Sequence, residues 1–326
     1  MKLIVMKFGG TSVGSIDKIN NVANIVEKQL NDKKLIVVLS AMSGVTNKMQ
    51  EYIDEIESNE VIENDLILTS GEAVSVGLLS AILKKRKIKS IPLLGWQIPI
   101  ITDSNHQKAK ILNIDKNRID QFLKDYDVIV VAGFQGVDMD GNITSLGRGG
   151  SDTTAVAVAA AVDADRCDIY TDVEGVYSTD PNIEPKAKKI SKLAFEEMLE
   201  MSSMGAKVLH TRSVELAMKN NLILQVLSSI TKKDGTFILD EKNMIEKEIV
   251  SGVSYSKNES KITISGIPDK PGISAQIFGL LADKNINVDM IVQNISQDGI
   301  LANITFTVPN LEINSAKELL KNNKDN

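Results

Sequence analysis

The stretch LIVMKFGGTSVGS, residues 3–15, joins a short apolar run to a loop that contains a lysine and two adjacent glycines. The run is rich in aliphatic residues and hydrophobic on both faces, which is typical of a buried parallel strand. After the loop, apolar residues recur at steps of three and four, which makes one helix stripe; they are Ile16, Ile19, Ala23, Val26 and Leu30. A strand, a tight loop and a helix in this order predict the beginning of a β–α–β unit.

The same pattern repeats along the first two-thirds of the chain. Four further apolar runs read as buried strands: LIVVL (35–39), VIVVAGF (128–134), CDIYT (167–171) and LILQV (222–226). Helical stripes over residues 73–83 and 155–162 lie between them. We therefore predict an α/β fold, a three-layer sandwich with helices on both faces of a mainly parallel central sheet. Ligands of such sheets bind at the carboxyl ends of the strands, so the residues after each run are the candidates for a site.

The pattern changes near residue 240, where the charged stretch DEKNMIEKE reads as a linker. We predict one domain over 1–240 and a second over 249–326. The second shows the order β–α–β–β–α, which is one strand short of a ferredoxin-like repeat. A strand-like piece, IVSGVSY (249–255), precedes it without an obvious partner. We expect this second domain to be incomplete.

Composition limits the class of protein. The net charge of −6, the absence of a basic block and an aromatic content of 4% argue against nucleic acid as a partner. A single cysteine, Cys167, excludes an internal disulfide and favours a reducing cytosol, with Cys167 as inert core. No apolar run approaches the roughly 20 residues that span a bilayer. We expect a cytoplasmic protein that handles a small molecule, without a membrane partner.

Five polar clusters lie at the predicted strand ends or, in the case of TSGE, open a helix, and MGAKVLH is a sixth candidate near a helix start. They are KFGGTSVGS (7–15), SAMSGVTN (40–47), TSGE (69–72), SLGRGGSDTTA (145–155), TDVEGVYSTDPN (171–182) and MGAKVLH (204–210). Each alone reads as a glycine turn, a helix cap or a proline turn. At one sheet edge, however, they combine glycine-rich loops, helix N-termini, cations and carboxylates, which favours an anionic, phosphate-containing ligand. There is no GxxxxGK[ST] loop and no protein-kinase motif set. The two histidines lack cysteine companions, so we expect no zinc site and a structural hydrogen-bonding role for His210.

Taken together and in this order, KFGGTSVG, SGE, LGRGGSDTTA, YTDVEGVYSTDP and GAKVLH resemble the aspartokinases of the amino-acid kinase family, over essentially the whole chain. The DKPG turn followed by NINVDMIVQN resembles the ACT regulatory unit of the same enzymes. The resemblance implies an enzyme that phosphorylates the side-chain carboxylate of L-aspartate with ATP and Mg²⁺. The product, 4-phospho-L-aspartate, begins the route to lysine, threonine, methionine and diaminopimelate. The acceptor is already ionised at neutral pH, so this chemistry needs no general base.

The resemblance also implies roles for individual residues. Lys7 and Asp152 would be catalytic, with Lys7 stabilising the transferring phosphoryl group and Asp152 orienting lysines. The nucleotide would contact Lys7, Phe8, Gly9, Gly10, Ser40, Thr171, Asp172, Tyr177, Asp180 and Lys207. Aspartate would contact Thr46, Glu72, Arg148, Gly149 and Ser151, with Glu72 receiving its ammonium group and Arg148 clamping a carboxylate. A lysine or threonine effector would contact Asp269, Gly272, Ile273, Gln293 and Asn294. No residue is assigned to the metal.

Departures from the family pattern lead to further expectations. Asn182 stands where many relatives have an arginine, which predicts weaker binding of ATP and therefore a higher KM for ATP. The ACT-like region stops early, so we expect weak feedback inhibition unless a partner chain completes it, in a homodimer or with another ACT-containing chain. Two alternatives stay open: a kinase of the same fold acting on another small carboxylate, and a non-catalytic amino-acid sensor.

Overall fold

The computed structural model describes residues 2–31, 33–206, 208–231, 233–243, 251–255, 257–284, 286–295 and 301–322. Contacts divide the chain into two units, Met1–Ser254 and Tyr255–Asn326, and each is described by itself.

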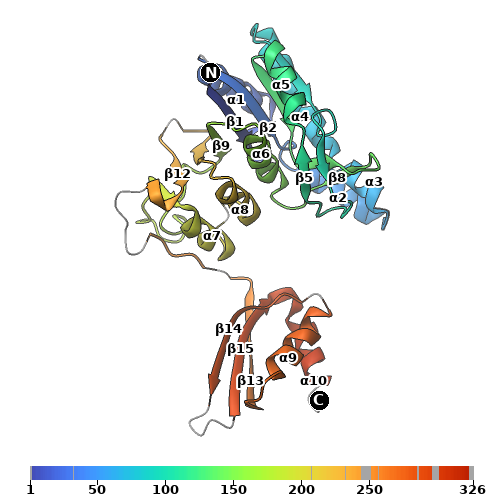
Figure 1. Ribbon diagram of the computed structural model, residues 1–326, viewed down its shortest axis with the longest axis vertical. Coiled ribbons are helices and arrows are strands. Elements are labelled where there is room, and N and C mark those ends of the chain that lie inside the picture. Colours follow the sequence, from blue (N-terminus) through green and yellow to red (C-terminus); the bar gives the residue numbers. More distant parts are fainter. Residues whose placement is uncertain are drawn as a thin grey trace. The chain divides into compact units, whose positions relative to one another are not determined.

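The first unit is built on an eight-stranded sheet (Figure 1). Its order is β10-β12-β11-β9-β1-β2-β6-β3, and the run from β11 to β3 is parallel throughout. Only the β11–β12 pair is antiparallel, so the predicted mainly parallel sheet is confirmed. The strands are β1 (Lys2–Phe8), β2 (Lys33–Leu39), β3 (Ser90–Leu93), β6 (Val128–Ala132), β9 (Arg166–Thr171), β10 (Lys192–Ala194), β11 (Leu224–Ser228) and β12 (Thr236–Leu239).

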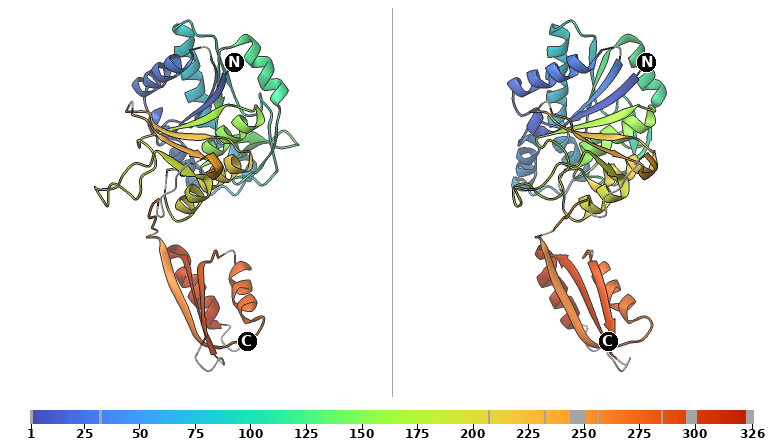
Figure 2. Two further views of the ribbon diagram at one scale, coloured as in Figure 1. Left: turned by 60° about the vertical axis from the view of Figure 1, so that its left-hand side comes forward. Right: turned by 90° about the vertical axis from the view of Figure 1, so that its left-hand side faces the viewer.

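Helices cover both faces of this sheet, which confirms the three-layer sandwich (Figure 2). The helices are α1 (Ile16–Gln29) and α4 (Ser70–Lys85) on one face, and α5 (Lys116–Asp125), α6 (Gly150–Ala161) and α8 (Thr211–Lys219) on the other, with α7 (Phe195–Ser203) against α8. Successive strand residues point to opposite faces, so Val5 packs in the α6 layer and Met6 in the α1–α4 layer. Both layers bury mainly apolar side chains against the sheet, which explains the apolar runs of the strands.

A smaller four-stranded sheet extends the first unit and was not expected from the sequence. Its order is β5-β4-β7-β8, with β4 (Ile100–Thr102), β5 (Ile111–Ile114), β7 (Gln135–Val137) and β8 (Ile143–Ser145). Strands of three or four residues are too short to show a two-residue period. The strand predicted over 128–134 was too long, because β6 ends at Ala132 and Phe134 takes a positive φ of 68°.

Two consecutive helices, α3 (Val61–Leu68) and α4, form a run of 25 residues that is apolar and long enough to cross a membrane by length and composition. Half of its most apolar window is buried inside the unit. Asp65 and Glu72 interrupt the run and are themselves buried, and α4 packs on α1, β3 and β6. This packing identifies the run as a core element of the first unit.

The second unit has the predicted order β–α–β–β–α: β13 (Glu259–Pro268), α9 (Ile273–Ala282), β14 (Asp289–Ile295), β15 (Leu301–Pro309) and α10 (Ile313–Asn322). Its sheet is antiparallel in the order β13-β15-β14. The core joins Leu281, Phe306 and Ala316, one from each of α9, β15 and α10. The strand expected at 249–255 is wrong over its described part, 251–255, where Val253 N donates instead to Ser178 O in the first unit at 2.7 Å. Residues 249 and 250 lie outside the described residues.

Candidate active site

The carboxyl ends of five parallel strands form one continuous edge in the first unit. Backbone hydrogen bonds join the residues that follow them: Ser40 N donates to Phe8 O at 3.2 Å, Gly133 N to Leu39 O at 2.9 Å and Ser229 N to Thr171 O at 2.9 Å. The loops after β1, β2, β6, β9 and β11 therefore meet, as the parallel sheet predicts.

Lys7 and Asp152 form an ion pair at this edge. Lys7 lies near the end of β1, and Asp152 lies in the first turn of α6. Lys7 Nζ is 2.6 Å from Asp152 Oδ1, and the two side chains are 12% and 14% exposed. A Cβ added to Gly9 would lie 3.4 Å from this ammonium. The missing side chain of Gly9 therefore leaves one side of the Lys7 ammonium open to an anion.

The glycine-rich loop passes close to the loop after β2. A Cβ on Gly10 would lie 3.0 Å from Ala41 O, so only a glycine fits there without displacement of the backbone. The chain then makes a short 3₁₀ turn, Gly10–Ser12, and enters α1, where Ser15 caps the helix by accepting from Lys18 N. The turn is anchored because Ser12 Oγ donates to Ser229 Oγ at 2.8 Å.

Glu72 is a buried carboxylate beside this loop. It lies on α4 and is 2% exposed, and its Oε1 accepts from Ala41 N at 3.0 Å. Its Oε2 is buried without a hydrogen-bond partner in the described part of the chain. Burial raises the pKa of Glu72 to about 7, against the lowering effect of the bond from Ala41. A buried carboxylate oxygen without a donor is a good acceptor for an ammonium group.

The other residues predicted to hold the acceptor lie on the loop before α6, in the first turn of α6 and in the first turn of α2. Arg148 is exposed on the loop before α6, and none of the described residues hydrogen-bonds or pairs with it. The glycines on either side, Gly147 and Gly149, both have positive φ, of 74° and 72°. Ser151 is buried on α6, and a Cβ on Gly133 would lie 2.8 Å from it. Thr46 is half-buried in the first turn of α2 (Val45–Glu55).

The residues predicted to bind the nucleotide are only partly brought together. Thr171 ends β9 at the edge and donates to Asp172 Oδ1 at 3.1 Å. Tyr177 O–H donates to Glu174 Oε2 at 3.3 Å, and burial raises its pKa. Asp180 accepts from Asn182 N and Nδ2 at 2.9 and 3.1 Å, so its carboxylate stabilises the turn in which it lies. Within the described ranges no hydrogen bond or ion pair connects Tyr177 or Asp180 to Thr171. Lys207 lies outside the described residues.

Several residues at this site escaped prediction from the sequence. Ser229 anchors the 3₁₀ turn, and its place directly after β11 was a usable signal. Asp65 is an acid inside an apolar helix stretch, which is also a signal. The prediction for His210 is wrong: its Nδ1 has no hydrogen-bond partner in the described structure, and its ring packs on Gly149, where an added Cβ would lie 2.3 Å from its Cγ. Cys167 is fully buried, as expected.

The residues predicted to hold an effector gather in the second unit. Gln293 Nε2, on β14, donates to Asp269 Oδ1 at 3.1 Å. Asp269 follows β13, and the next turn leads to Gly272, the N-terminal cap of α9 with a φ of 96°. Ile273 begins α9, and Asn294 pairs with Asn303 in the ladder.

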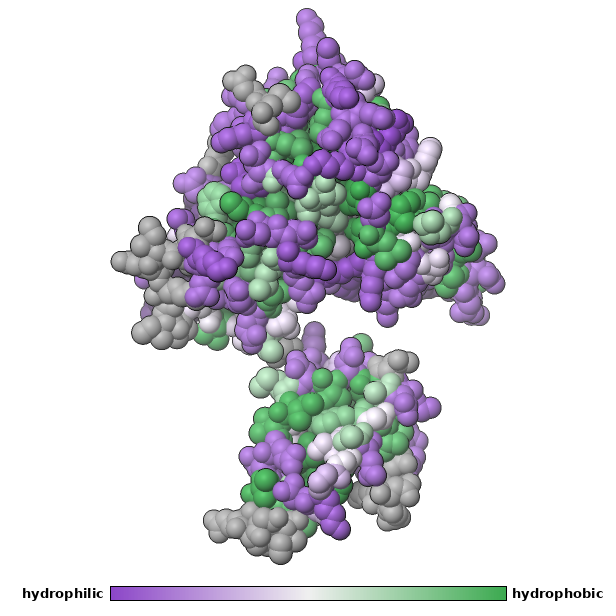
Figure 3. Space-filling model, viewed as in Figure 1, coloured by the Kyte–Doolittle hydropathy of each residue, from purple (hydrophilic) through white to green (hydrophobic). Residues whose placement is uncertain are grey.

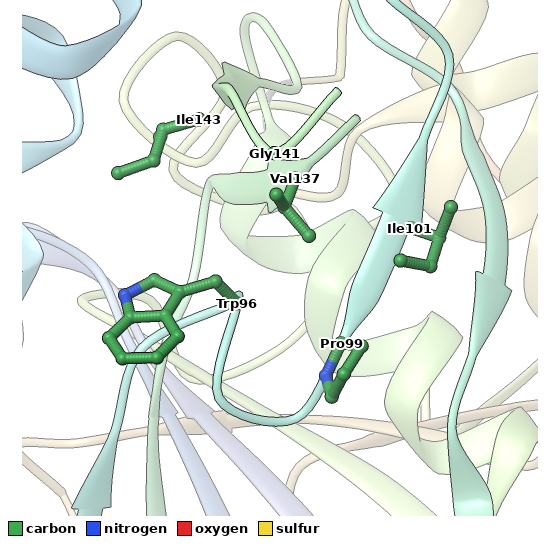
Figure 4. Close-up of a pocket in the computed structure, with 6 residues that line it drawn as sticks. All are labelled: Trp96, Pro99, Ile101, Val137, Gly141 and Ile143. Atoms are coloured by element: carbon green, nitrogen blue, oxygen red, sulfur yellow. The ribbon is translucent and has the colours of Figure 1, made fainter. Parts of the chain in front are cut away.

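The described residues contain no group of three histidine, cysteine or acidic side chains that could hold a metal ion. The first unit has a hollow of about 500 Å³ on the small sheet, shown in Figure 4. Its lining is apolar: Trp96, Pro99, Ile101, Val137, Gly141 and Ile143. None of the predicted site residues lines it, and it offers no charge to a phosphate or an amino acid, so we place the chemistry at the sheet edge.

Comparison with known proteins agrees with the observed fold. The amino acid kinase family matches residues 2–228, and the ACT domain matches residues 262–323. An aspartate kinase of Pseudomonas putida is 50% identical over 325 residues, which are 99% of this chain and 79% of that protein. Crystal structures of E. coli aspartokinase III are similar in fold. The complex with aspartate and ADP has a TM-score of 0.77 and 26% identity, and the complex with lysine and aspartate has 0.74 and 27%. Each covers 94% of this chain and 79% of the other.

Proposed function

This chain belongs to the amino acid kinase family, as one of its aspartate kinases, and from that premise we propose how its residues divide the work. The reaction transfers the γ-phosphoryl group of ATP to the side-chain carboxylate of L-aspartate. A carboxylate oxygen forms a bond to phosphorus, the bond to the β-phosphate oxygen breaks, and ADP leaves. The product, 4-phospho-L-aspartate, begins the biosynthesis of lysine, threonine, methionine and diaminopimelate.

The phosphates bind at the end of β1. Lys7 supplies the cation for the charge that spreads over the transferring group, and Asp152, 2.6 Å away, holds the ammonium in place. Gly9 and Gly10 let the phosphates approach the backbone, and Ser40 lies on the neighbouring loop. Because the acceptor is already an anion, Asp152 does not need to take a proton.

The acceptor binds between Glu72 and Arg148. The observation that carries this proposal is the buried Glu72 Oε2, which lacks a donor that the aspartate ammonium group supplies. Arg148 is free to pair with a carboxylate in a bidentate geometry. Thr46, Gly149 and Ser151 line the remaining wall, on α2 and at the start of α6.

The nucleotide lies along the loop after β9. Thr171 and Asp172 lie at the sheet edge, and we assign Tyr177, Asp180 and Lys207 to the same ligand. The predicted contact of Phe8 with the nucleotide is not kept, because Phe8 is fully buried and stacks on Tyr170. The phosphates of ATP would supply oxygen ligands to Mg²⁺. When bound, the ion would neutralise phosphate charge during the transfer. We place the enzyme in the cytoplasm, where ATP and aspartate are available.

The direct test is hydroxamate formation from aspartate and MgATP. We expect turnover with L-aspartate and none with N-acetyl-L-aspartate, because acetylation removes the ammonium group that Glu72 receives. Equal turnover of the two would contradict the Glu72 assignment. A panel of acceptors that includes glutamate distinguishes aspartate from another small carboxylate as the substrate. If no acceptor in the panel is phosphorylated, the chain is a non-catalytic amino-acid sensor and the proposed activity is wrong.

The second unit is proposed to bind lysine or threonine at Asp269, Gly272, Ile273, Gln293 and Asn294. The Asp269–Gln293 pair offers a carboxylate and an amide beside a helix N-terminus, which suits an amino acid. The edge strand β14 exposes Met290, Ile291, Val292 and Ile295, and Figure 3 shows apolar side chains over this sheet. An exposed apolar edge favours pairing with a second ACT-containing chain, in a homodimer or a hetero-assembly.

Calorimetric titration with lysine and with threonine tests the effector. We expect one of them to bind, and Asp269→Ala to abolish that binding while the basal turnover persists. Light scattering tests the assembly: Val292→Lys should shift a dimer toward monomer. Binding unaffected by Asp269→Ala, or a mass unaffected by Val292→Lys, would contradict the respective assignment.

A further inference from the structure

The loop that carries Arg148 runs beside a second segment of the first unit. We call residues 145–149 the arginine loop. Ala109 N donates to Ser145 O at 3.0 Å, and a Cβ on Gly147 would lie 2.8 Å from Gln107 O. The two segments therefore touch along their backbones. Arg148 itself has no partner in the described structure, so its position depends on the backbone that carries it.

One buried anion holds both segments from the side of α3. Asp65 is fully buried, and its carboxylate accepts from Gln107 N at 3.1 and 3.2 Å and from His106 Nδ1 at 2.7 Å. The same carboxylate accepts from Ser145 N at 3.0 Å and from Ser145 Oγ at 2.5 Å. Bonds to an ionised group are roughly twice as strong as neutral ones. Asp65 therefore ties the start of the arginine loop to the helix that leads into α4 and Glu72.

One partly buried cation holds the same two segments from the side of α8. Arg212 Nη1 donates to Leu146 O at 3.0 Å, and its Nη2 donates to Ala109 O at 2.9 Å. Two residues earlier, the His210 ring packs on Gly149 at the other end of the arginine loop. The planar fork of arginine donates to the two carbonyls from two nitrogens in a fixed geometry, whereas a lysine carries all its donors on one nitrogen at the end of a flexible stem.

We propose that Asp65 and Arg212 are positioning residues for the acceptor substrate. Each bonds one backbone group of each segment, and together they set the distance of Arg148 from Glu72. The inference rests on the proposed roles of Arg148 and Glu72. A pair of residues that binds both ends of a small substrate must be placed accurately, because a misplacement of about 1 Å can cost about 100-fold in rate.

The predicted signature is a selective loss of affinity for aspartate. In the described part of the chain no hydrogen bond or ion pair joins Asp65 or Arg212 to the Lys7–Gly10 loop, so we expect the phosphate end to change less than the acceptor end. We expect Arg212→Met and Asp65→Asn to raise the KM for aspartate about tenfold, while the KM for ATP changes less than about twofold. Arg212→Lys and Ser145→Ala remove only part of these hydrogen bonds, so they should raise the KM for aspartate by less than tenfold. These milder variants serve as the test if Arg212→Met or Asp65→Asn does not fold.

Arg86→Gln is the matched control. Arg86 also bridges two elements, through Asn24 Oδ1 at 2.7 Å and Asn20 O at 3.3 Å, but it lies between α1 and α4. It should lower the melting temperature without separating the two KM values. If Arg212→Lys and Ser145→Ala raise both KM values equally or neither, the positioning role is wrong.

A double-mutant cycle separates this inference from the function on which it rests. In an Arg148→Gln background, Arg212→Met should add little to the KM for aspartate, because the side chain that it positions is gone. If Arg148→Gln alone leaves that KM unchanged, the proposed role of Arg148 fails. If Arg148→Gln raises it and the effect of Arg212→Met is fully additive, only the positioning role fails.

Discussion

Lys7 and Glu72 show how single charges at the sheet edge acquire their properties. Lys7 is held by Asp152 and kept open by the missing side chain of Gly9. Glu72 is an ordinary carboxylate whose pKa is raised because the surrounding protein removes its water. The cation faces the phosphates and the carboxylate faces an ammonium, so each charge is complementary to its proposed ligand.

Replacing Lys7 tests the cation. We expect Lys7→Ala to lower kcat by about 100- to 1000-fold, because a preorganised charge in the transition state is lost. Lys34→Ala is a matched control, since Lys34 also lies on a strand and pairs with an aspartate, Asp127, at 2.9 Å. The control should retain kcat. A Lys7→Ala enzyme with near-normal kcat in the same steady-state assay would contradict the assignment.

Glu72 predicts a pH dependence of aspartate binding. With a pKa of about 7 in the free enzyme, Glu72 is mostly protonated at pH 6 and cannot pair with an ammonium. We expect the KM for aspartate to fall about tenfold between pH 6 and pH 8, while the KM for ATP stays level. In Glu72→Gln the KM for aspartate should be high and flat over that range; a retained slope would assign it to another group.

The same shift affects stability with a defined sign. The folded chain favours protonated Glu72, so its contribution to the free energy of unfolding falls as pH rises from the ordinary value of 4.5 through about 7. Urea titrations at pH 5 and pH 8 should show this loss in the wild type and a smaller one in Glu72→Gln.

At the scale of elements, the site depends on how helices begin. α6 starts with Gly149 in the left-handed region, which turns the arginine loop into the helix and places Asp152 in the first turn, toward Lys7. α8 starts at His210, whose ring closes on Gly149. The two helix starts therefore fix the arginine loop between them.

Gly149→Ala tests this junction. Gly149 combines a φ of 72° with a Cβ position 2.3 Å from the His210 ring, whereas Gly141 has a φ of 86° and nothing within 4 Å. We expect Gly141→Ala to lower the free energy of unfolding by about 1 kcal/mol from backbone strain alone. Gly149→Ala should lower it by about 3 kcal/mol, since overpacking is added. If urea titrations give equal losses in the free energy of unfolding for the two variants, the His210 ring moves aside without an energetic penalty and the overpacking prediction is wrong.

At the scale of the whole molecule, two units with separate cores share one chain. The second unit has a small core around Phe306 and one helix-covered sheet. Small domains bury a smaller fraction of their surface and are correspondingly less stable. Catalysis and the proposed effector site thus lie in parts that can unfold separately.

The single tryptophan allows the unfolding of the two units to be measured separately in one experiment. Trp96 lies in the first unit, so its fluorescence reports only that unit, whereas far-ultraviolet circular dichroism reports both. We expect a first transition, at lower urea, that is seen by dichroism and not by fluorescence. The effector amino acid should shift that first transition to higher urea. Coincident curves from the two probes would contradict separate unfolding.

The sequence by itself determined the layered fold and the loops of the site. Buried parallel strands and crossover helices are recognisable because their periods of apolar residues are local properties, as residues 3–30 show. The sequence also placed Lys7 and Arg148 in glycine-rich loops at the strand ends, because a parallel sheet brings all its carboxyl ends to one edge. The roles of Lys7, Glu72 and Arg148 followed from the resemblance to the aspartokinases.

Only the tertiary structure decided how these residues are held. The Lys7–Asp152 pair, the burial of Glu72 and the grip of Asp65 and Arg212 on the arginine loop join segments that are distant in sequence. The small sheet consists of strands too short to carry a period. Such contacts have no local pattern, because the chain reaches them only after the large sheet has brought its loops together.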